Sequence, residues 1–123
     1  MRRANLKAMT TEQLVQRFIE LGVQQDAELS AYNTTAFNRL FDQMDDVKQE
    51  LKARENDQRR ALLPLYDHPN AQVRLKAAVA TLALAPQAAR RMLEIIANSR
   101  EYPQAGDAGM TLRQLDRGAF KPT

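Results

Sequence analysis

The sequence predicts an all-α fold in which about three antiparallel helical hairpins stack on one another. Three observations carry this prediction. Apolar residues recur at helical spacing along the whole chain, strand-type alternation bounded by glycine turns is absent, and most segments are joined by only a few residues. Connections that short make consecutive helices antiparallel neighbours.

The first half predicts two helices. One begins at Thr10, where Gln13 completes a weak capping box, and ends at Gly22. The polar stretch 23–35 fits either a short helix or a loop. A long helix follows over residues 36–54, because an apolar stripe runs through Phe37, Leu40, Phe41, Met44, Val47 and Leu51. We interpret the acidic pair Asp45–Asp46 on its other face as solvated rather than metal-binding.

The second half predicts four more helical segments. The segment 57–66 begins at Asp57 and is kinked or shortened by Pro64. Residues 67–85 open with a turn and continue as a helix. The next segment, 86–98, has Pro86 in its first turn. The last segment, 103–118, closes at Gly118, after which Phe120 is expected to fold back onto the body.

The segment 67–85 predicts stacking of the hairpins. Its only charges after Val73 are Arg74 and Lys76, both near its start, so the rest has no polar face. A helix of this kind has to be covered on several sides, as the inner helix of a middle hairpin would be. We therefore expect Val79 and Leu82 to be buried. A short echo, HPNA at 68–71 and YPQA at 102–105, also indicates a repeat of 34 residues.

The same region resembles a HEAT-type repeat. The match is carried by six residues of the turn and the inner helix, Asp67, Pro69, Val73, Arg74, Ala77 and Ala78. It departs from the pattern at Pro64 and in a turn that is one residue longer. Over more of the chain, residues 37–86 and 103–123 resemble a small bacterial family of unknown function with a HEAT-like (ARM-type) fold. The resemblance implies an α-α superhelix and no activity, and points towards immunity-like proteins of toxin systems.

Composition limits the class of protein. The 123 residues fit a single domain, 1–123, in which residues 1–9 are expected to form a flexible N-terminal arm. There is no Cys and only one His, so we expect no metal site and no cofactor. No apolar run reaches the about 20 residues of a membrane span, and no signal peptide is apparent. A cytoplasmic protein with no membrane partner is expected.

The sequence offers little for catalysis, and we expect no enzyme. His68 stands beside Asp67 and could serve as a general base, but neither serine lies in a nucleophile motif. We read His68 as a turn residue. Arg74 is expected to form a structural ion pair with Asp67 or with Asp107, since a guanidinium suits a carboxylate.

Two arginine doublets are the candidate interaction site. Arg59–Arg60 and Arg90–Arg91 lie near the starts of their helices, where a cation is poorly placed. The net charge of +3 comes from the second half: residues 57–123 have ten Lys/Arg and six Asp/Glu. The doublets could form one basic patch, or pair with Asp57, Glu55 or Glu94 as a solvated face. The leading hypothesis is a non-catalytic protein-interaction or adaptor module with an acidic partner. The alternative is nucleic-acid binding through the basic second half.

Overall fold

The protein is all-helical in the part that the structure, a computed structural model, describes, which is residues 3–123. Helices appear in the order α1 (Arg3–Lys7), α2 (Thr11–Ser30), α3 (Thr34–Ala53), the 3₁₀ helix η1 (Gln58–Asp67), α4 (Ala71–Ala80), α5 (Pro86–Ala97) and α6 (Gln104–Asp116). The chain divides into two compact units, one ending at Ala61 and the other running from Leu62 to Thr123.

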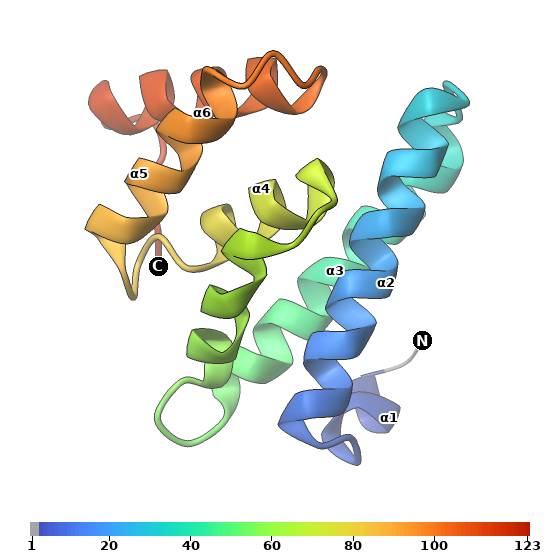
Figure 1. Ribbon diagram of the computed structural model, residues 1–123. Helices are drawn as coiled ribbons and strands as arrows, with labels where there is room; N and C mark the ends of the chain where they lie inside the picture. The colour runs from blue at the N-terminus through green and yellow to red at the C-terminus, as the bar shows by residue number, and fades with distance from the viewer. Residues whose placement is uncertain (1–2) are drawn as a thin grey trace. The chain divides into compact units, whose positions relative to one another are not determined.

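The first unit is built on the antiparallel hairpin of α2 and α3, whose helices lie side by side in Figure 1. As predicted, Thr10 and Gln13 form a capping box at the start of α2, with Gln13 Oε1 accepting from Thr10 N at 2.8 Å. The buried side chains of the hairpin include Leu14, Phe18 and Leu21 of α2. From the predicted stripe of α3, Met44, Val47 and Leu51 are buried, whereas Phe41 is exposed.

The end of the first helix was predicted wrongly. Gly22 does not terminate α2, which continues to Ser30 with Gly22 buried in its interior. The buried face continues through Gln25, whose side chain is 0% exposed and donates from Nε2 to Met44 Sδ at 3.6 Å. A glutamine at a core position interrupts the apolar periodicity of the sequence. Gly22 was therefore wrongly interpreted as the end of the helix.

The expectation of a flexible arm over residues 1–9 also needs correction from Arg3 onward. Residues 1 and 2 lie outside the described part of the chain. Helix α1 spans Arg3–Lys7, and Leu6 is fully buried. Arg54, at the end of α3, donates from Nη2 to the carbonyl oxygens of Leu6 at 3.1 Å and Met9 at 2.6 Å. Its Nε also donates to Glu50 Oε2 at 3.0 Å. The guanidinium thereby ties the N-terminal segment to α3.

The second unit packs α4, α5 and α6 around one apolar cluster. The cluster consists of Leu75, Ala78, Leu82, Ala89, Met92, Leu93, Ile96 and Ala108. Phe120 packs against it, as predicted, after α6 ends with Gly118 in the left-handed region at φ 71°. Leu82 is 4% exposed, whereas Val79 is only half-buried, contrary to the expectation that both are buried.

Two segments of the second half differ from the predicted helices. Residues 58–67 wind as a 3₁₀ helix that contains Pro64, whose ring would clash with the carbonyl group four residues earlier in an α-helix. Helix α4 is shorter than the segment 67–85. It begins after the N-cap Asn70 and ends at Ala80, and a turn over residues 81–84 follows. No helix in the described part of the chain has the length and apolar character needed to cross a membrane.

Candidate functional site

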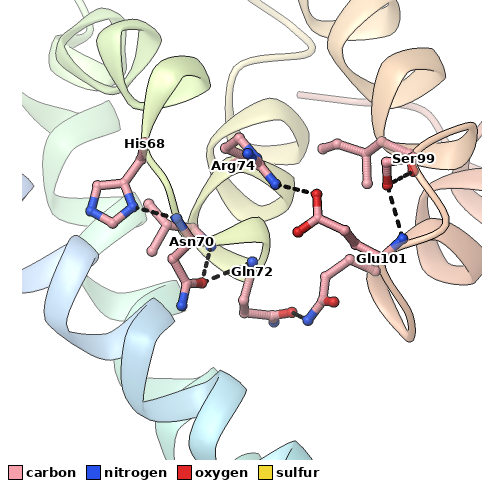
Figure 2. Close-up of polar contacts among 9 residues, drawn as sticks. His68, Asn70, Gln72, Arg74, Ser99 and Glu101 are labelled. Carbon is pink, nitrogen blue, oxygen red and sulfur yellow. Dashed lines mark hydrogen bonds and ion pairs between the residues drawn. The ribbon is translucent and has the colours of Figure 1, made fainter.

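A polar cluster surrounds the start of α4, all of it within the second unit (Figure 2). Asn70 caps the helix, since its Oδ1 accepts from Gln72 N at 2.9 Å and Val73 N at 3.2 Å. His68 Nδ1 in turn accepts from Asn70 N at 3.0 Å. The lone pair of His68 Nδ1 therefore serves the turn, in keeping with the structural interpretation of this residue.

The acid partner of Arg74 differs from both predicted ones. Arg74 Nη2 lies 2.7 Å from Glu101 Oε1 (Figure 2). Asp67 and Asp107 are exposed and form no ion pair within the described chain. Glu101 belongs to the connection between α5 and α6, where Ser99 Oγ accepts from its backbone N at 3.2 Å. The fold brings this connection to the start of α4, which local spacing could not predict.

Two buried glutamines lie next to this ion pair and were missed by sequence reasoning. Gln104 Nε2 donates to Gln72 Oε1 at 3.0 Å, and both side chains are buried. The bond links the first turns of α4 and α6. Glutamine is ordinarily a surface residue, so only the proximity of these two helix starts could reveal the pair.

The arginine doublets divide between the units, and the two members of each doublet differ. Arg59 is 5% exposed and donates from Nε and Nη2 to the two carboxylate oxygens of Asp57 at 2.9 and 2.7 Å. These bonds hold the pKa of the Asp57 carboxyl below its ordinary value. Arg60 is exposed and forms no ion pair within residues 3–123.

In the second unit, Arg90 lies 2.9 Å from Asp116 Oδ1 and 3.6 Å from Glu94 Oε2. The hydrogen bond with Asp116 raises the pKa of the Arg90 guanidinium. Arg91 is exposed and, like Arg60, pairs with no acid among the described residues. One cation of each predicted doublet is thus paired with a nearby acid, whereas Arg60 in the first unit and Arg91 in the second have no ion pair among the described residues.

A groove lies between α4 and α6 in the second unit. It has a volume of about 220 Å³ and is lined by Leu75, Lys76, Val79, Asp107, Met110, Thr111 and Gln114. Met110 stands 53% exposed at its edge. Farther along α6, Arg113 and Arg117 are exposed four residues apart and form no ion pair within the described chain. The groove thus combines apolar side chains, an exposed thioether and the charged side chains of Lys76 and Asp107, and the two arginines lie farther along the chain, outside its lining.

Acidic residues elsewhere do not gather into a metal site. Asp45 pairs with Lys48 at 3.1 Å on the exposed side of α3. Among the described residues, no group of three or more His, Cys, Asp or Glu side chains could hold a metal ion.

Comparison with known proteins places these features in a family. The crystal structure of the protein RPA1889 from Rhodopseudomonas palustris CGA009 is similar, with 53% sequence identity, a TM-score of 0.93, and coverage of 96% of this chain and 98% of that one. No curated protein matches significantly. The model of the family described as domain of unknown function (DUF2019) matches residues 12–116. This match covers most of the chain, which therefore belongs to the DUF2019 family.

Proposed function

We propose that this chain is a non-catalytic protein-interaction module with a HEAT- or ARM-type superhelix, and that an acidic segment of a partner protein binds along the α4–α6 groove. The groove is the observation that carries the proposal. Its floor of Leu75 and Val79 can take an apolar side chain, and Met110 at its edge has the flexible side chain that suits adaptable contacts.

The charges along α6 favour an acidic partner segment that binds in one orientation. Asp107 lines the groove near the start of α6, and Arg113 and Arg117 lie towards its end. Ten residues separate Asp107 from Arg117, which corresponds to about 15 Å along a helix. An acidic residue of the partner gains attraction beside the arginines and meets repulsion beside Asp107, so the charge pattern orients the bound segment.

The repeat echo supports the superhelix. HPNA at 68–71 leads into α4 and YPQA at 102–105 leads into α6. Leu62 and Ile96, which are also 34 residues apart, are both fully buried. Small-angle X-ray scattering of the full chain tests this part of the proposal. Stacked hairpins should give one well-defined maximum dimension, whereas units that move independently should give a broad distribution.

A random peptide library displayed on phage tests the groove. Peptides selected on the wild-type protein should be rich in Asp and Glu next to an apolar residue. Their binding should fall about tenfold in R113E/R117E, which reverses two exposed positive charges. The matched control is R39E/R60E, which makes the same change of charge at two exposed arginines outside the groove. Equal peptide binding by the two double variants would contradict the groove proposal.

Nucleic-acid binding is the alternative, because Arg91, Arg113 and Arg117 could equally contact phosphates. Duplex DNA should bind weakly if the protein-interaction proposal holds. Tight DNA binding that falls steeply between low and physiological salt, and is lost in R113E/R117E, would favour the alternative.

A further inference from the structure

The turn that ends α2 has a bulky residue where glycine is usual. Asn33 N donates to Glu28 O at 3.0 Å and Tyr32 N donates to Leu29 O at 3.1 Å, which is the Schellman pattern. The same pattern ends α6, where Ala119 N donates to Gln114 O and Gly118 N to Leu115 O. In α6 the left-handed position holds Gly118 at φ 71°, and in α2 it holds Tyr32 at φ 56°.

Nothing within the described chain explains a tyrosine at this position. The left-handed region is unfavourable for a bulky side chain, and the Tyr32 side chain is 93% exposed. It therefore contributes little burial to offset its backbone cost. Tyrosine is among the residues that contribute most at protein interfaces, so an external contact would account for its presence.

A pocket lies beside Tyr32 at this end of the hairpin. It has a volume of about 360 Å³ and is lined by Glu28, Leu29, Tyr32, Asn33, Thr34, Phe37 and Asn38. Phe37 continues the apolar surface to Phe41, whose ring centroid is 6.5 Å away and whose side chain is exposed. We call this hollow the Tyr32 pocket. All of its residues belong to the first unit, so it is separate from the α4–α6 groove.

The charge of the Tyr32 pocket is negative. Of the lining residues, Glu28 alone is charged, and it forms no ion pair within the described chain. The last turn of α2 contains no basic residue that could neutralise it. The C-terminal end of α2 and the N-terminal end of α3 meet at this turn, so the partial charges of the two helix dipoles oppose each other. The carboxylate of Glu28 therefore gives the pocket its negative charge.

We propose that the Tyr32 pocket binds an arginine or lysine side chain of a partner protein. The apolar wall of Leu29 and Phe37 can cover the aliphatic stem of such a side chain. The face of the exposed Tyr32 ring attracts the cationic head, and the Glu28 carboxylate pairs with it. Apolar walls, an aromatic face and one carboxylate together match a cation with a long stem better than they match an acidic or a purely apolar side chain.

NMR titration with defined peptides tests this proposal. The probes are acetyl-Leu-Arg-amide and acetyl-Leu-Lys-amide, compared with acetyl-Leu-Gln-amide and acetyl-Leu-Glu-amide. The cationic peptides should shift the backbone amide signals of Tyr32, Asn33 and Phe37, with an affinity about fivefold above that of the glutamine peptide. The glutamate peptide should bind most weakly.

Three variants identify the source of the selectivity. Glu28→Gln should remove most of the preference for the cationic peptides. Tyr32→Gly should abolish the shifts without lowering the melting temperature, because glycine suits the left-handed position. Tyr102→Ala, which removes another exposed tyrosine in the other unit, is the matched control and should bind as the wild type does. Equal affinity for the arginine and glutamine peptides, shifts that map elsewhere, or no saturable shift at all would each overturn the proposal.

Discussion

Leu82 shows at the scale of a single residue how α4 and the turn after it are held in the second unit. It is 4% exposed and belongs to the apolar cluster of that unit. Leu82→Ala should lower the free energy of unfolding by about 2–5 kcal/mol, through lost transfer energy and the cavity left behind. Urea denaturation measures the effect. An unchanged midpoint would show that the site is not packed as described.

Asp57 gives the protein a defined acid sensitivity. Its pKa is lowered in the folded state, chiefly by the hydrogen bond from Arg59. A carboxyl group of this kind stabilises the fold above its unfolded pKa of about 3.9, and the stabilisation is lost as the pH falls through the lower folded value. Wild type and Asp57→Asn should therefore differ most in unfolding free energy near neutral pH and converge in acid. A difference that stays constant with pH would contradict this prediction.

Arg74→Lys should lower the free energy of unfolding by less than the loss of a bidentate ion pair would. Its one ion-pair contact joins Nη2 to Glu101 Oε1, and the side chain of Glu101 is half exposed. An ammonium can replace a single contact of this kind, and exposed pairs contribute about 0–1 kcal/mol. Chemical denaturation of Arg74→Lys should show a loss within that range. A loss of several kcal/mol would indicate that the guanidinium fork is needed after all.

At the scale of the helices, Gly106 inside α6 and Gly118 just after its end are expected to respond in opposite directions to replacement by alanine. A Cβ added at Gly106 would meet no atom within 4 Å, and a glycine in a helix costs about 0.5–1 kcal/mol relative to alanine. Gly106→Ala should therefore raise the melting temperature. Gly118→Ala should lower it, because Gly118 has a φ of 71°. The same sign for both variants would refute this account of α6.

At the scale of the whole molecule, each unit has its own set of fully buried side chains. Leu93 is 0% exposed within the cluster of the second unit, and Leu21 is equally buried in the first. Amide protection reports local opening, so Leu93→Ala should increase hydrogen exchange mainly in α5 and α6. Leu21→Ala should do so mainly in α2 and α3. Equal loss of protection throughout the chain in both variants would mean that the units open together.

The sequence by itself determined the helical class of this protein and much of its local structure. The apolar periods predicted α2, α3, α5 and α6, and the capping box at Thr10 and the closure at Gly118 were confirmed. These features depend on residues close together in the chain, whose preferences for caps, turns and buried faces are expressed within a few residues.

Tertiary structure alone decided which distant residues meet. Buried Gln25 continues a helical face past Gly22, Arg54 fixes the N-terminal segment, and Glu101 replaces both acids predicted for Arg74. The Gln72–Gln104 bond and the groove beside Met110 arise in the same way. The physical reason is that a polar side chain is stabilised by whichever partner the packed helices bring within hydrogen-bonding distance, and sequence separation does not encode that distance.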